Sequence, residues 1–586
     1  MGNLFYPAPL NNGNFSKIES FEEQAMETLI SQLSRSFFIF ISLSLICFLA
    51  SNSVLAQISD IGLVATPDSH ATQIALEILE QSGNAIDAGV AAMFALSVVQ
   101  PYASGMGGGG FMLIQMTQDK QPIIVDFREQ APKNTNPSIF YQDNEIFNIY
   151  TKYGYRSICV PGMVAGVEKA LKSHGTMTFK QILQPTIDLA TSGFIVSEAL
   201  ANLITENYDL LESNRATSFI FLPDWYPLKQ GQIVKRDDLA LTFSLLTIHG
   251  PKVFYHDEIA TGMFDELTSH NGLIQLEDLK VYQPMVKQPI RGKFQNLEIL
   301  STPPPSSGGT SLIELLMILE KFDLNKLSIN SGPYIHLVVE VMKQIFEDRE
   351  RYFMGDPEFD SINPQIVLSD NHIQKCFHQI DSMNVRSTSN EKIPGTHQES
   401  HNASHISIVD RDGNAISVSY TLNSLFGSAV TIPKYGILLN NAMNNFSSDS
   451  SNNNSLKPGK RPQTTLTPTI LLKNQKPYLV LGGSGAERII SMLAQIIINI
   501  VNFRMSLEDA VHAPRFHYNY YDNVIEMETR IEANAIDYLK KLGHKINLRK
   551  DFDIYFGSAQ VILIDPSNHI ASSVNDVRQP GQVYFK

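Results

Sequence analysis

The stretch 399–425, ESHNASHISIVDRDGNAISVSYTLNSL, decides the fold of this chain. Its first half, HISIVD, alternates apolar and polar residues, as a half-buried strand does. Asp412-Gly413 then supplies a turn before a second strand, AISVSYTL, so the sequence predicts a β-hairpin. The question of activity falls at the head of the first strand, at Ala403 and Ser404.

Composition bounds the class of protein. The chain has 586 residues, of which 43% are apolar and 18% charged, enough for an extensive core or two joined halves. A formal net charge of −14 argues against a nucleic-acid surface, which needs a concentrated basic face. Three cysteines without a C-x-x-C pair do not predict a disulfide framework.

Residues 1–56 are predicted to be an N-terminal extension and a signal peptide. Arg35 precedes an apolar run at 37–49, and residues 53–56, SVLA, carry the small side chains of a signal cleavage site. Met26 is a candidate start. We therefore expect export, to the periplasm or outside the cell, and an uncleaved signal would instead anchor the chain in a membrane.

Punctuated apolar patterns outline the elements outside the hairpin. The Ser/Asn tract 447–455 is predicted to be a surface lid or loop. Strands are expected at 470–473 and 478–481. Helices are expected at 71–81, 85–100, 310–321, 336–353 and 488–501.

Two patterns look like ligand sites but lack the usual context. The glycine run 107–110 leads into a strand and is not followed by Lys-Ser/Thr, so close backbone packing is favoured over phosphate binding. His397, His401 and His405 are spaced for a metal on a helix, but a Pro-Gly pair ahead of them and the strand pattern disfavour that helix. We predict neither a metal nor a cofactor.

Arg128 lies at a strand end, in DFRE, beside the glycine-rich loop. A guanidinium there can hold a carboxylate with two parallel hydrogen bonds. A surface ion pair with Glu129 is the alternative interpretation.

Ser484 lies in GGSGA, between a predicted strand and a predicted helix. The arrangement is similar to the nucleophile elbow G-x-S-x-G, although Ala486 replaces the last glycine. The backbone N–H groups at such a helix start are equally suited to an oxyanion hole.

Nine strings in order, spread from about residue 60 to the end, resemble the γ-glutamyltransferase (glutathione hydrolase) family. They are SGNAIDAGVAA, GMGGGGFMLI, DFREQAP, VPGMVAG, PPPSSGG, DGNAISVSYTLNSLFG, GILLNNAM, RPQTTLTPT and EDAVHAPRF. The resemblance implies an α+β N-terminal-nucleophile hydrolase fold, an αββα sandwich. It also implies a precursor that cuts itself into a large subunit, here residues 57–402, and a small subunit, here residues 403–586.

In that family the new N-terminal threonine attacks γ-glutamyl amides, and the γ-glutamyl group passes to water or to an amino acid. The partner implied is therefore a small γ-glutamyl compound or an amino acid, and a subunit heterodimer exists only if the cut occurs. The α-amine freed by the cut serves as the base that activates the threonine hydroxyl.

The resemblance places the nucleophile position on Ala403, which has no side-chain oxygen. Ser404 is a candidate substitute, but the chain would have to cleave one residue later. Because side chains alternate across a strand, that slip would aim Ser404 at the opposite face unless a bulge or loop shift intervenes.

Two further positions depart from the family pattern after GILLNN. Where the family holds the substrate's α-ammonium with an acidic or amide residue and an aspartate, this chain has Ala442 and Asn445. A lost hydrogen bond to a charged group is worth about 1.5–3 kcal/mol. The oxyanion pair corresponds to Gly485-Ala486, a milder change because the backbone N–H survives. The family's remaining site residues correspond to Arg128 for the α-carboxylate, Thr421, Asn423, Thr464 and Thr465.

Three hypotheses follow. The chain is a γ-glutamyltransferase with ordinary or impaired activity, which requires Ser404 or another nucleophile. Alternatively it is an uncleaved, non-catalytic family member that binds an amino acid or peptide through Arg128, as the joint changes at Ala403, Ala442 and Asn445 favour. The third hypothesis is a serine hydrolase that uses Ser484.

Overall fold

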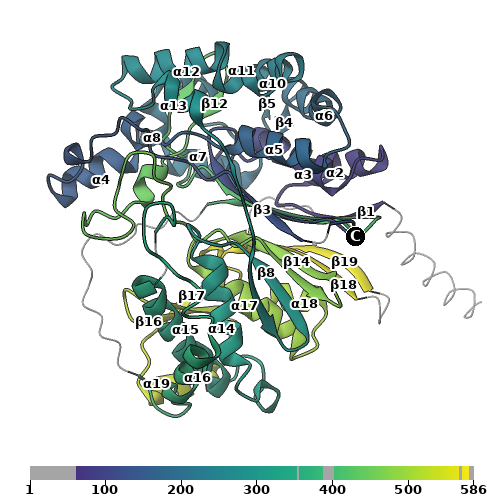
Figure 1. The fold of residues 1–586 in the computed structure, drawn as a ribbon, viewed down its shortest axis with the longest axis vertical. Coiled ribbons are helices and arrows are strands. Elements are labelled where there is room, and N and C mark those ends of the chain that lie inside the picture. The colour runs from purple at the N-terminus through teal and green to yellow at the C-terminus, as the bar shows by residue number, and fades with distance from the viewer. Residues whose placement is uncertain (1–60, 120, 353–354, 387–401, 566–569, 580–586) are drawn as a thin grey trace, which may run out of the picture. The chain divides into compact units, whose positions relative to one another are not determined.

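Two six-stranded antiparallel sheets lie face to face, and helices cover the outer side of each (Figure 1). The computed structural model describes residues 61–119, 121–352, 355–386, 402–565 and 570–579. The predicted signal peptide, with Met26, and two of the three spaced histidines, His397 and His401, lie outside the described residues.

The hairpin predicted from the sequence lies inside the first sheet. The strand order of this sheet is β1 (Gly62–Ala65), β9 (Ser404–Asp410), β10 (Ala415–Thr421), β2 (Gly109–Gln115), β3 (Ile123–Asp126) and β6 (Met285–Lys287). The second sheet runs β19 (Ile570–Asn575), β18 (Ser558–Asp565), β14 (Lys476–Ser484), β13 (Thr469–Lys473), β8 (Leu297–Ser301) and β7 (Ile290–Phe294). A small third sheet holds β15 (Phe516–Asn519), β16 (Val524–Glu528) and β17 (Ile546–Arg549).

Helices complete the four layers. The helices against the first sheet include α2 (Ser69–Glu80), α3 (Ala85–Val99), α5 (Met163–His174), α6 (Phe179–Ser192) and α10 (Asp237–His249). Those against the second sheet include α14 (Gly308–Leu319), α15 (Gly332–Tyr352), α16 (Asp370–Gln379), α17 (Arg488–Val501), α18 (Leu507–His512) and α19 (Ala533–Leu542). The predicted αββα sandwich is therefore confirmed.

Each sheet mixes strands from before and after residue 403. In the first sheet β9 pairs with β1 on one side and β10 pairs with β2 on the other. In the second sheet β13 pairs with β8. Neither sheet is complete without both halves of the chain, so a cut at residue 403 would leave two fragments that share both sheets.

Local chemistry explains why the hairpin and α3 form where they do. Asp410 accepts hydrogen bonds from the backbone N–H groups of Asp412 and Asn414, each at 3.0 Å, and Gly413 adopts φ +82° in the turn. The other oxygen of Asp410 accepts from the N–H of Ala85 at 3.0 Å, which joins the turn to the start of α3. Asn84 and Asp87 form a capping box there, so the one acidic residue of this buried helix caps its first turn.

Several predicted boundaries shift. α14 and α15 begin a few residues earlier than predicted, at Gly308 and Gly332, and β14 continues to Ser484. The tract 447–455 is not wholly at the surface, because Asn454 is fully buried. In the described part of the chain, no helix is both long enough and apolar enough to cross a membrane.

Candidate functional site

Ala403 lies just before β9 and faces the second sheet. It is only 5% exposed and belongs to the apolar cluster between the sheets, together with Phe111 of β2 and Leu300 of β8. The position that corresponds to the family's nucleophile therefore presents a buried methyl group.

Ser404 points the other way, as the alternation of a strand predicts. Its hydroxyl accepts a hydrogen bond from Ser104 at 2.7 Å and donates one to Gln100 Oε1 at 3.1 Å, at the end of α3. The side chain is fully buried. Its oxygen thus lies on the helix side of β9, on the opposite face from Ala403.

A residue of β10 hydrogen-bonds to the peptide bond between Asn402 and Ala403. The hydroxyl of Thr421 donates to the carbonyl oxygen of Asn402 at 2.5 Å and accepts from the backbone N–H of Asn423 at 2.8 Å. Asn423 adopts φ +84° and donates from its side chain to the carbonyl of Asn441 at 3.1 Å. Thr421 therefore polarises the carbonyl that a nucleophile at residue 403 would attack, and Asn423 links it to the segment that carries Ala442.

Arg128 is fully buried and already has partners. Its Nη1 lies 2.5 Å from Glu129 Oε2, and Nε and Nη2 donate to the carbonyls of Pro462 and Gln463 at 3.3 Å each. The predicted Arg128–Glu129 pair exists, but neither side chain is exposed, so the prediction of a surface pair is wrong. Burial raises the pKa of Glu129, although Arg128 beside it favours the ionised carboxylate.

A buried ionic network supports the loop that carries Arg128. Asp126 accepts from Lys287 at 2.7 Å, from Arg461 at 2.8 Å and from the backbone N–H of Arg128 at 3.0 Å. The two cations outweigh burial and hold the pKa of Asp126 below its ordinary value. No sequence pattern predicted this network, although the strings DFREQAP and RPQTTLTPT contain Asp126 and Arg461.

The residues at the predicted ammonium position are apolar or neutral. Ala442 is fully buried in a small apolar cluster. The side chain of Asn445 is partly exposed, and its backbone carbonyl accepts from Asn454 at 2.6 Å. No carboxylate therefore occupies either of these two positions.

Thr464 and Thr465 follow the carbonyls that Arg128 contacts. The backbone carbonyl of Thr464 accepts from the N–H of Ser307 at 2.9 Å, and its N–H donates to Pro305 at 3.1 Å. The loop PPPSSGG thus fixes the two threonines close to Arg128. Ser306 Oγ of this loop also accepts from the backbone N–H of Gly308, the first residue of α14, at 3.2 Å.

The predicted oxyanion pair lies where β14 turns into α17. Gly485 has φ +134° and Ala486 has φ +54°, so the turn places alanine in a left-handed conformation that glycine adopts more easily. Ser484 is the last residue of β14. The serine that bonds to a histidine there is Ser491 of α17, which lies 2.9 Å from His517 Nδ1, and not Ser484.

His405, the second residue of β9, lies between the sheets without a metal-binding partner in the described part of the chain. Its ring nitrogens lie 2.7 Å from Ser419 Oγ and 3.0 Å from Ser407 Oγ. Gly482 makes room for it, because a Cβ built on Gly482 would lie 2.2 Å from the ring. Burial lowers the pKa of His405 to about 3, so the ring is neutral.

The comparisons with known proteins agree with this architecture. Residues 71–585 match the family model described as Gamma-glutamyltranspeptidase. The "Glutathione hydrolase proenzyme" of Escherichia coli (strain K12) is 35% identical over 525 residues, covering 87% of this chain and 89% of that protein. The protein of the same name from Bacillus subtilis (strain 168) is 34% identical over 537 residues, covering 89% and 90%. The crystal structure of cephalosporin acylase from Bacillus halodurans has a TM-score of 0.80 at 27% identity, covering 90% of this chain and 96% of that one.

The stacked sheets, with the head of β9 between them, define the class of N-terminal-nucleophile hydrolase folds. Within that class, the chain belongs to the γ-glutamyltranspeptidase family, which confirms the resemblance found in the sequence.

Proposed function

We propose that this protein is a non-catalytic member of its family that remains one uncut chain. The observation that carries the proposal is the methyl side chain of Ala403 at the head of β9. Self-cleavage before residue 403 needs a side-chain oxygen that attacks the Asn402 carbonyl, and alanine supplies none. Without the cut there is also no free α-amine to act as the base.

Regions 57–402 and 403–586 then correspond to the two subunits of a cut relative but stay covalently joined. The ligand we propose is an amino acid or a small γ-glutamyl compound. Its carboxylate would lie near Thr464 and Thr465 and take the place of a backbone carbonyl that Arg128 now contacts. Ala442 and Asn445 leave the ammonium end without a carboxylate, so binding is weaker than in a relative that carries one. The segment 35–56 supports export to the periplasm or beyond.

The test uses the full chain expressed with its N-terminal segment. We expect one band on a denaturing gel, an intact mass that spans the 402–403 bond, and no turnover of a chromogenic γ-glutamyl anilide. Isothermal titration with L-glutamate and with glutathione measures the remaining binding, and Arg128→Gln should abolish it.

Other outcomes would support the other hypotheses. Two bands, with Ser404 as a new N-terminus and activity lost in Ser404→Ala, would overturn the proposal in favour of a working transferase. Turnover by an uncut chain that disappears in Ser484→Ala would identify a serine hydrolase instead. The buried contacts of Ser404 with Ser104 and Gln100 weigh against the first of these.

A further inference from the structure

Three helices on the outer side of the second sheet bring four metal-binding side chains together, away from Ala403. Glu314 lies on α14, Asp348 on α15, and His372 and Cys376 lie one turn apart on α16. One donor atom from each of the four lies within 4.8 Å of all the others.

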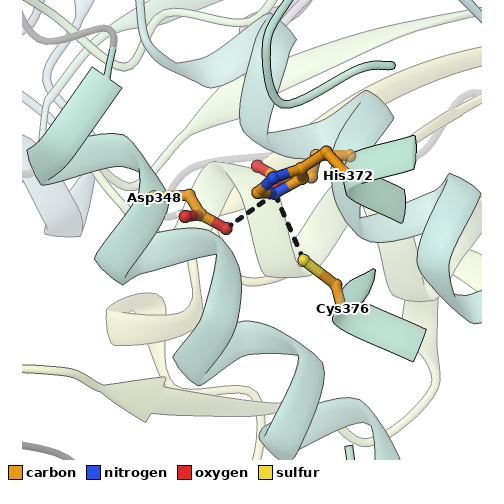
Figure 2. A group of neighbouring side chains, drawn as sticks. Asp348, His372 and Cys376 are labelled. Carbon is orange, nitrogen blue, oxygen red and sulfur yellow. Dashed lines mark hydrogen bonds and ion pairs between the residues drawn. The ribbon is translucent and has the colours of Figure 1, made fainter. Parts of the chain in front are cut away.

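The contacts converge on one nitrogen. His372 Nε2 lies 3.0 Å from Asp348 Oδ2, 3.2 Å from Glu314 Oε1 and 3.2 Å from Cys376 Sγ. Figure 2 shows the imidazole pointing between the Asp348 carboxylate and the Cys376 sulfur. A single ring N–H cannot satisfy three acceptors at once. Hydrogen bonds donated by this ring therefore leave at least two of the three contacts unexplained.

Glu314 provides a second, independent observation. Its side chain is fully buried, and its Oε2 atom has no hydrogen-bond partner among the described residues, while Oε1 of the same carboxylate reaches His372. An unsatisfied buried carboxylate oxygen is costly. A cation bound among these side chains would remove that cost.

The cluster does not have the geometry of a cysteine nucleophile with its base. In such a triad the thiol and the orienting carboxylate use different nitrogens of the histidine ring. Here Cys376 and Asp348 both contact Nε2. Cys376 is 1% exposed, so a substrate has no access to its sulfur.

We propose that Glu314, Asp348, His372 and Cys376 form a zinc site that fastens α16 to α14 and α15. One thiolate, one imidazole and two carboxylates are ligands that Zn²⁺ takes in tetrahedral sites, and sulfur disfavours Mg²⁺ and Ca²⁺. Bonds of about 2.0–2.3 Å place tetrahedral ligands about 3.3–3.8 Å apart. The observed separations from His372 Nε2, 3.0–3.2 Å, are slightly shorter than this range, and all four donor atoms lie within 4.8 Å of one another.

The negative charge of the buried carboxylates also favours a bound cation. Glu314 and Asp348 place two buried carboxylates against His372. The His372 side chain is 12% exposed, which leaves an approach for the ion from solvent.

A second cluster of possible metal-binding side chains already contains a positively charged side chain. His336, Glu340 and His544 also lie close together on α15 and after α19. There the ammonium of Lys343 lies 2.8 Å from Glu340 Oε1, and His336 Nδ1 bonds with His544 Nε2 at 2.8 Å. A lysine already supplies the positive charge, so we assign no ion to this second cluster.

The experiment uses the full chain and is independent of whether the protein is cut or active. The purified protein is stripped with a chelator and titrated with Zn²⁺ and with Co²⁺. We expect one equivalent of zinc per chain. The Co²⁺ form should show a sulfur-to-metal charge-transfer band, which reports directly on Cys376. Anomalous diffraction at the zinc edge should place the ion within bonding distance of all four side chains.

Cys376→Ser should remove the charge-transfer band. Glu314→Gln is the second variant, because it keeps the shape of the side chain while removing its charge. Loss of an outer partner of a metal site costs about 10–100-fold in affinity, so loss of a direct ligand should weaken zinc binding by at least about 100-fold. Cys159→Ser is the matched control, because it removes the other buried free thiol among the described residues. It should bind zinc as the wild type does.

Zinc that binds equally well to the wild type, Cys376→Ser and Glu314→Gln would overturn the proposal. So would a stripped wild-type chain that takes up no zinc, or a Co²⁺ band that survives in Cys376→Ser. If either variant fails to fold, the Co²⁺ spectrum and the anomalous peak of the wild type decide the question alone.

Discussion

The hydroxyl of Ser104 donates to that of Ser404 at 2.7 Å, on the helix side of β9. One residue earlier, Ala403 faces the other sheet. The hydroxyl and the position of the missing nucleophile are therefore on opposite faces of one strand. A neighbouring serine does not restore the chemistry that Ala403 lacks unless the strand itself shifts.

Ala403→Thr should restore self-cleavage. The new hydroxyl would lie beside the Asn402 carbonyl that Thr421 already holds at 2.5 Å. We expect two fragments on a denaturing gel and a threonine at the N-terminus of the smaller one. Ala403→Val, of similar shape but without oxygen, is the control and should stay uncut. Persistence of a single band in the threonine variant would show that further parts of the cleavage machinery are missing.

Ser404→Ala should destabilise the fold, and the variant should remain one uncut chain, as we propose for the wild type. The variant loses the hydrogen bond to Gln100 and leaves Ser104 short of an acceptor, at a cost of about 1–3 kcal/mol. Urea unfolding, followed by circular dichroism, measures the loss. If the wild type were cut and Ser404→Ala were not, with the same free energy of unfolding in both, Ser404 would instead be the nucleophile.

Asn445→Asp, added to Ala403→Thr, should raise kcat/KM for γ-glutamyl substrates. A carboxylate at residue 445 can pair with a substrate ammonium, and a hydrogen bond to a charged group is worth about 1.5–3 kcal/mol. That corresponds to about 10–150-fold in kcat/KM. Progress curves with a γ-glutamyl anilide compare the double variant with Ala403→Thr. Substrates that lack the α-ammonium should show no gain, and an equal gain with them would contradict the assignment.

The alternation of residues 405–410 was sufficient to predict the hairpin and the opposite directions of Ala403 and Ser404, since a strand has a strict period of two. It did not predict that β14 runs on through Gly482 and Gly483, because glycine is a poor strand former. The structure shows the reason for Gly482, which is the space taken by His405 across the sheets. Such a requirement arises from a partner about 80 residues away in the chain and leaves no local pattern.

The same limit explains the cluster on the outer helices. From the sequence, only His372 and Cys376 share a helix face, and a lone pair of that kind predicts nothing specific. Glu314 and Asp348 join them through the packing of three helices. The burial of the Arg128–Glu129 pair was likewise hidden, because adjacent charges in a sequence usually lie at the surface.

Gly482→Ala should destabilise the sandwich, because the added methyl would lie 2.2 Å from His405 Cε1. Overpacking of a tight core costs about 1–3 kcal/mol or more. Gly105→Ala is the matched control, since its nearest contact would be an ordinary 3.6 Å from Ser97. Thermal unfolding compares the two. Equal melting temperatures would mean that the His405 ring moves aside without cost.

Acid should destabilise the fold through its buried neutral histidines. Burial lowers the pKa of His405, His517 and His544 to about 3 each, against an ordinary value of 6.5. Between these two pH values the unfolded chain binds a proton at each site and the folded chain does not. The contribution of these three histidines to the free energy of unfolding is therefore fully present above pH about 6.5. It is lost as the pH drops, by about 1.4 kcal/mol per pH unit for each site.

His405→Gln tests the part of this pH dependence that comes from one of the three histidines. Glutamine can still bond to Ser419 and Ser407, but it does not titrate. Urea unfolding at pH 7.5, 6.0 and 5.0 should give a pH dependence that is shallower than that of the wild type by about 1.4 kcal/mol per unit below pH about 6.5. A slope that is the same in His405→Gln and in the wild type would mean that His405 can be protonated in the folded state.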